Sequence, residues 1–133
     1  GRKENVSSKL LKSIAEVEKL TINNNGLTFN ICFNYGGRSE IIDAVKKIIE
    51  SEEKNINEET FKKYLYSDIP DPELVIRTSG EFRISNFLLW QIAYSEIYVT
   101  DVLWPDFDEK EFDKAIENFQ NRNRRFGGVE DVK

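Results

Sequence analysis

Apolar residues recur at helical spacing in three long stretches of the chain. The first follows Ser7-Ser8 and runs to Leu20, the second begins at Ser39, and the third begins after Asp108. Ser and Asp side chains can accept hydrogen bonds from the free N–H groups of a helix start. Asp108 is followed three residues later by Glu111, a variant of the capping box. We therefore predict three amphipathic helices.

Two further segments have helical patterns. Residues 57–66 form a short candidate helix. Residues 87–94 follow Ser85-Asn86 and are apolar on most faces, which is typical of a buried helix. Both segments connect stretches with the character of strands.

Three short apolar runs predict strands, at residues 27–33, 74–76 and 97–100. The first stops at a glycine turn, and the second delivers Arg77 at its C-terminal end. Strands that alternate with helices form parallel sheets. The sequence predicts an α/β fold with a partial parallel sheet of about three strands and flanking helices. Because parallel sheets are normally covered on both faces, missing sequence or another chain should complete this one.

Composition limits the possible functions. The chain has 133 residues, which suits one domain over 1–133, and a net charge of −5, which disfavours a general role in binding nucleic acid. Histidine is absent, and the single Cys32 lies in an apolar run, so we expect no zinc site, no internal disulfide and a buried Cys32. No apolar stretch is long enough for a membrane span. These features favour a soluble, cytoplasmic protein.

Polar residues follow the predicted strands, where open α/β sheets bind their ligands. The segment from Arg77 to Asn86 holds two arginines, three hydroxyl side chains and a glycine before a predicted helix. Arginine grips two phosphate oxygens at once, so the segment could cradle a diphosphate. It could equally be a polar loop in which the arginines pair with Glu81 and Ser85 only caps the next helix.

Three other candidates have simpler alternatives. Residues 34–38 are more readily explained as a strand-to-helix turn than as a binding loop. Glu96 could bind Mg²⁺, but a lone acid is more often a solvated charge. The cations of residues 122–125 suit a helix C-terminus, although they could also reach a phosphate.

Taken together, these residues resemble the cis-prenyltransferase family, which includes undecaprenyl diphosphate synthase. The resemblance covers nearly the whole chain, and the run from Arg77 to Gln91 is its most specific part. The matching motifs, in family order, are Asn34-Tyr35-Gly36-Gly37-Arg38, Asp71-Pro72-Glu73-Leu74-Val75-Ile76-Arg77-Thr78-Ser79-Gly80-Glu81, Arg83-Ile84-Ser85-Asn86-Phe87-Leu88-Leu89-Trp90-Gln91, Trp104-Pro105-Asp106-Phe107 and Arg124-Arg125-Phe126-Gly127-Gly128.

The resemblance implies a Mg²⁺-dependent isoprenyl transferase that joins an allylic prenyl diphosphate to isopentenyl diphosphate in cis geometry, as a homodimer. Only its product is expected to associate with membranes. The resemblance also implies roles for single residues. The isopentenyl diphosphate ligands would be Arg77, Arg83, Ile84 and Ser85. The metal ligand would be Glu96. Arg125 and Gly127 would form the Arg-x-Gly motif that reaches the partner subunit's site.

One departure from the family is large. The N-terminal half, with its phosphate-binding loop and catalytic aspartate, has no counterpart, so Gly1 is expected to begin partway through the domain. We predict no catalytic residue in this chain and no activity of the chain alone. One alternative is a non-catalytic partner subunit, but the intact Arg77–Ser85 pattern disfavours it. Another is an unrelated nucleotide-binding module. Such a module should have a glycine-rich fingerprint after its first strand, and residues 34–38 do not contain it.

Overall fold

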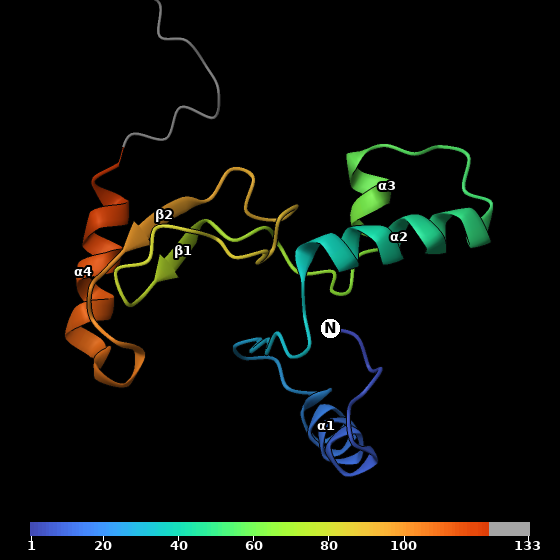
Figure 1. Ribbon diagram of the computed structural model, residues 1–133, viewed down its shortest axis with the longest axis horizontal. Helices are drawn as coiled ribbons and strands as arrows, with labels where there is room; N and C mark the ends of the chain where they lie inside the picture. The colour runs from blue at the N-terminus through green and yellow to red at the C-terminus, as the bar shows by residue number, and fades with distance from the viewer. Residues whose placement is uncertain (123–133) are drawn as a thin grey trace, which may run out of the picture. The chain divides into compact units, whose positions relative to one another are not determined.

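A computed structural model describes residues 1–122 (Figure 1). The chain forms two compact units, Gly1–Tyr66 and Ser67–Lys133. Each unit is described by itself, and the prediction of one domain over 1–133 stays a prediction. Within residues 1–122, no helix is both long and apolar enough to cross a membrane.

The first unit is helical. It contains α1 (Ser8–Thr21), α2 (Gly37–Ser51) and the short α3 (Glu58–Lys62). The predicted cap of α1 is confirmed, because the Ser7 side chain accepts from the Leu10 N–H at 3.3 Å. Asn57 and Thr60 form a reciprocal capping box that starts α3. The predicted helix over 57–66 therefore forms only in its first half.

The core of the first unit joins α2 to the segment that follows it. Figure 1 shows α3 beside α2. The Ser51 and Tyr64 hydroxyls lie 2.9 Å apart, and Lys47 Nζ donates to the Tyr64 carbonyl at 3.1 Å. The buried apolar side chains of this unit are Ala44, Ile48, Phe61 and Leu65. Burial of these side chains stabilises α2 and α3 against each other.

The second unit contains a two-stranded parallel sheet of β1 (Leu74–Arg77) and β2 (Glu96–Val99). Leu74 is opposite Glu96, and Arg77 is opposite Val99. A 3₁₀ helix, η1 (Trp104–Asp106), precedes α4 (Glu109–Gln120), which packs against β2. Asp108 caps α4 by accepting from the Glu111 N–H at 3.1 Å, as predicted. The α/β class and the parallel sheet are confirmed.

The third predicted strand is not present. Residues 27–33 form no ladder with β1 or β2, which are the two strands of the described part. Their apolar side chains are exposed, up to 94% for Leu27, and Cys32 is exposed as well. A strand needs a hydrogen-bonding neighbour, and the alternation of side chains alone does not supply one. The expectation of a buried Cys32 is therefore wrong.

The predicted helix over 87–94 is also wrong. This segment consists of turns. Positive φ angles occur at Ser85 (46°), Asn86 (65°) and Leu88 (43°). A right-handed helix needs φ near −63°, so these three residues prevent a regular helix from starting. Ile92 is nevertheless buried, whereas Phe87 and Tyr94 are exposed.

Candidate functional site

The loop after β1 is fixed to the loop after β2. The Ser79 N–H donates to the Val102 carbonyl at 2.9 Å, and the Gly80 N–H donates to the Thr100 carbonyl at 2.8 Å. Gly80 has a φ of 66°, and a Cβ there would lie 2.6 Å from Asp101 Oδ1. Only glycine fits this left-handed, crowded position without strain. The carboxyl ends of both strands thus present one firmly held loop.

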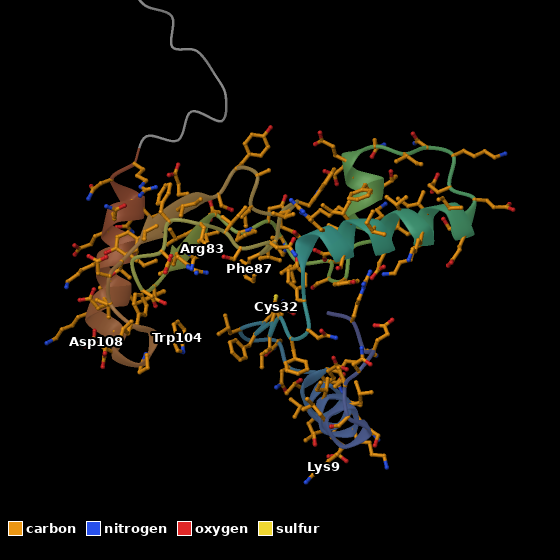
Figure 2. All side chains as sticks on the ribbon, in the orientation of Figure 1. Lys9, Cys32, Arg83, Phe87, Trp104 and Asp108 are labelled. Carbon is orange, nitrogen blue, oxygen red and sulfur yellow. The ribbon has the colours of Figure 1, made fainter. Side chains whose placement is uncertain are left out.

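A cleft of about 380 Å³ opens beside this loop. Arg83, Phe87 and Trp104, labelled in Figure 2, belong to its wall. Charged side chains at one cleft with apolar walls suit a ligand that has an anionic head and an apolar body. The full lining is Val75, Ile76, Arg77, Thr78, Ser79, Glu81, Phe82, Arg83, Ile84, Phe87, Ile97, Val99 and Trp104.

The two arginines of the cleft have different surroundings. Arg83 is exposed and forms an ion pair with Glu81, two residues before it. Arg77 is half-buried at the end of β1, and its guanidinium has no hydrogen bond or ion pair with any residue of 1–122. A partly desolvated cation without an internal anion favours binding of an external one. The alternative of a self-paired polar loop is therefore confirmed for Arg83 and wrong for Arg77.

Large apolar side chains stand open to solvent at the same cleft. Phe82 is 86% exposed and Trp104 is 73% exposed. The Trp104 ring stacks on Phe107 with centroids 6.1 Å apart and planes inclined by 8°. This stacking holds the indole in place at the cleft wall. Sequence reasoning did not assign Phe82, Phe87 or Trp104 to the site, although aromatic residues inside a polar loop were a usable signal.

Glu96 lies on the other side of β2. Ile97 and Val99 line the cleft, and side chains alternate between the two faces of a strand, so Glu96 points away from it. Its Oε2 accepts a hydrogen bond from Arg122 Nη1 at 2.7 Å. The predicted metal ligand therefore has an internal cation as its partner, which the sequence did not indicate.

The donor chemistry at Glu96 suits Mg²⁺ only as a single ligand. A partly exposed carboxylate oxygen is a hard donor, and Mg²⁺ commonly takes one or two carboxylates together with water and phosphate oxygens. Within residues 1–122, no group of three or more acidic, cysteine or histidine side chains could hold a metal. Further ligands would have to come from phosphate, water or residues outside this range.

The structure brings three of the predicted site residues together. Arg77, Arg83 and Ile84 share the cleft. Ser85 does not line it and caps no helix, because a left-handed turn follows. The predicted roles of Arg125 and Gly127 lie outside the described residues.

The first unit has polar residues of a different kind. Glu40 is 2% exposed; it accepts from the Tyr35 hydroxyl at 2.6 Å and from the Tyr66 N–H at 2.9 Å. Asp43 accepts both arms of the Arg2 guanidinium at 2.8 Å and also the Tyr66 hydroxyl. These bonds hold the pKa of the Asp43 carboxyl well below its ordinary value. Glu40 and Asp43 thus stabilise the first unit through hydrogen bonds to residues of the same unit.

The turn before α2 is held by hydrogen bonds to the N-terminal segment. The Asn34 side chain, at a φ of 47°, donates to the carbonyls of Arg2 and Glu4 at 2.9 and 3.1 Å. Gly36 then precedes the first residue of α2. These bonds agree with the interpretation of residues 34–38 as a turn into a helix.

Comparison with known proteins places the chain among prenyltransferases. The family model of undecaprenyl diphosphate synthase matches residues 1–127. The chain belongs to the undecaprenyl diphosphate synthase family. It is 67% identical over 132 residues to an isoprenyl transferase of Fusobacterium nucleatum, covering 99% of this chain and 57% of that protein. It is 53% identical over 134 residues to an isoprenyl transferase of Thermotoga maritima, covering 97% and 58%.

Two solved structures are similar in fold to this chain. A probable undecaprenyl diphosphate synthase of Campylobacter jejuni has a TM-score of 0.87 at 38% identity, over 96% of this chain and 60% of that one. The lavandulyl diphosphate synthase of Lavandula x intermedia, solved with dimethylallyl diphosphate, has a TM-score of 0.88 at 35% identity, over 96% and 58%. The chain thus spans somewhat more than half the length of these relatives. The predicted membership of the cis-prenyltransferases is confirmed.

Proposed function

We propose that this chain carries the isopentenyl diphosphate half-site of an isoprenyl transferase. The observation that supports this most is the Arg77 guanidinium, half-buried at a strand end beside Arg83 and without a partner in residues 1–122. A diphosphate would supply the missing anion. Ser85 would contribute a hydroxyl after a local change, since it stands just outside the cleft lining.

The apolar wall fits the rest of the same substrate. Isopentenyl diphosphate has a five-carbon apolar part, and the cleft offers Ile84, Phe87 and Trp104 next to the arginines. In prenyl transfer, the double bond of this substrate attacks an electron-poor allylic carbon after the allylic diphosphate departs. Side chains that exclude water protect that carbon. The two arginines would orient the acceptor and take no part in bond formation.

The remaining parts of the reaction depend on groups beyond this cleft. Mg²⁺, when bound, would offset the charge of the departing diphosphate, and Glu96 would be one of its ligands. The allylic prenyl diphosphate, the homodimer, and the contribution of Arg125 and Gly127 to the partner's site are proposed for the whole protein. We propose that the chain of 133 residues alone does not catalyse prenyl transfer. A cytoplasmic location stays a prediction.

Calorimetric titration with isopentenyl diphosphate, with and without Mg²⁺, tests the half-site. We expect saturable binding by the wild type and its loss in Arg83→Ala. Glu81→Ala should bind as well as the wild type or better, because it releases Arg83 from its internal partner. Lys110→Ala, which removes an exposed cation of α4, is the matched control and should bind normally.

Two outcomes would count against the proposal. Equal binding by the wild type and Arg83→Ala would mean that the diphosphate lies elsewhere. Equal losses in Arg83→Ala and Lys110→Ala would mean that only net charge matters. Formation of a radiolabelled prenyl product by the chain of 133 residues would refute its inactivity without affecting the binding site.

A further inference from the structure

Arg122 is held in place on two sides. Its Nη1 donates to Glu96 Oε2 at 2.7 Å, and its Nε donates to Asn118 Oδ1 at 3.0 Å. The side chains of Arg122 and Glu96 are 34% and 26% exposed. A pair with this degree of burial is less screened by solvent than the exposed ion pairs of the surface. The Glu96–Arg122 ion pair is therefore stronger than an ordinary surface ion pair.

The Glu96–Arg122 ion pair links the start of β2 to the end of α4 in the second unit. Glu96 is the first residue of β2, and Arg122 follows the end of α4, where its N–H donates to the Phe119 carbonyl at 3.2 Å. The sequence then continues to Arg125 and Gly127 within five residues. Release of the Arg122 side chain would remove the ion pair that anchors the last turn of α4 to β2.

We propose that Arg122 is the resident counter-ion of Glu96 and that a divalent cation competes with it for this carboxylate. Metal uptake then releases Arg122 and loosens the last turn of α4. This couples metal binding to the order of residues 118–122. The proposal rests on the metal role proposed for Glu96.

The competition follows from charge. Glu96 carries one negative charge, and Arg122 already matches it at hydrogen-bond distance. A dication at the same carboxylate would lie within a few ångströms of the guanidinium, and two cations at that distance repel each other strongly in a partly desolvated site. Within residues 1–122 no group of three or more acidic, cysteine or histidine side chains could hold the dication instead. One of the two cations therefore has to leave.

Titration with Mn²⁺ alone, followed by the electron paramagnetic resonance of free Mn²⁺, tests the competition on the whole chain. We expect Arg122→Gln to bind Mn²⁺ about three- to tenfold more tightly than the wild type. Arg122→Lys keeps the charge and should bind at the wild-type level, and Glu96→Gln should lose the site. Lys114→Gln is the matched control, since Lys114 is a cation of the same helix that pairs with Glu111.

A second measurement follows the coupling. Amide hydrogen exchange at residues 118–122 should become faster when Mg²⁺ is added to the wild type. In Arg122→Gln the exchange should be fast already and insensitive to Mg²⁺. This readout also reports whether the variant is folded, through the protection of the rest of α4.

The proposal is overturned if Arg122→Gln binds Mn²⁺ as the wild type does or more weakly, or if Lys114→Gln gains as much affinity. It is likewise overturned if neither the wild type nor Arg122→Gln binds Mn²⁺. In that case the isopentenyl diphosphate half-site still stands or falls on its own titration, which also runs without metal.

Discussion

The acids inside the first unit and Arg77 at the cleft of the second unit differ in whether a charged side chain has an internal partner. In Gly1–Tyr66, the buried Glu40 and the half-buried Asp43 accept hydrogen bonds on both carboxylate oxygens from residues of the same unit. In Ser67–Arg122, Arg77 lies beside an open cleft without such a partner. Internally satisfied charges stabilise a fold, whereas a partly buried charge without a partner lowers stability and favours a ligand. The difference separates structural from functional polar residues.

The largest expected effect on stability is that of Glu40→Ala. The change leaves the Tyr66 N–H and the Tyr35 hydroxyl without their acceptor in a buried site, which should cost about 3 kcal/mol. Amide exchange of α2 measures it, because both tryptophans lie in the second unit and fluorescence reports only that unit. Glu50→Ala, at an exposed position of α2, should change little. A loss of ligand binding with unchanged α2 protection would contradict the assignment of Glu40 to stability.

Gly80→Ala should come next, at about 2 kcal/mol, from the left-handed backbone and the crowding by Asp101. Tryptophan fluorescence during urea unfolding measures the loss. The matched control is Gly26→Ala, since nothing lies within 4 Å of a Cβ at that position. Because Gly26 belongs to the first unit, its unfolding is followed by the far-UV circular dichroism of the helices. Adding Asp101→Ala to Gly80→Ala should recover the part due to crowding. No recovery would mean that backbone strain accounts for the whole loss.

Asp43 should make the first unit sensitive to acid. Its pKa is lowered in the folded state by the Arg2 guanidinium and the Tyr66 hydroxyl, so the unfolded chain binds more protons as pH falls. The stabilisation is complete above about pH 5 and is lost progressively below about pH 4. Exchange of α2 amides between pH 3 and 7 should show this loss in the wild type. Asp43→Asn should be less stable at pH 7 and show a weaker dependence on pH; an unchanged slope would exclude Asp43 as its source.

The smallest expected effect on stability is that of Arg77→Ala, within about 0.5 kcal/mol, because no bond to residues 1–122 is lost. Its affinity for isopentenyl diphosphate should fall roughly tenfold or more, the loss of a charge-assisted bond. Urea unfolding and calorimetry on the same sample compare the two effects. A large loss of stability with normal affinity would place Arg77 with Glu40 and Asp43 and remove the contrast between the units.

Local patterns were sufficient for much of the fold. The caps at Ser7 and Asp108 predicted where α1 and α4 begin, because capping is satisfied by residues close in sequence. The apolar runs at β1 and β2 were correct, and so was the delivery of Arg77 to a strand end. The family was recognisable from its motifs, as the match over residues 1–127 confirms.

What depends on distant partners was decided only by the tertiary structure. Residues 27–33 have the composition of a strand but no neighbouring strand in the described part, and left-handed residues at positions 85, 86 and 88 keep residues 87–94 from forming a helix. The Glu96–Arg122 pair and the bond from the Tyr66 N–H to Glu40 each join residues 26 positions apart. Periodicity reports local preference, whereas strand pairing and ion pairing depend on which residues the folded chain brings together.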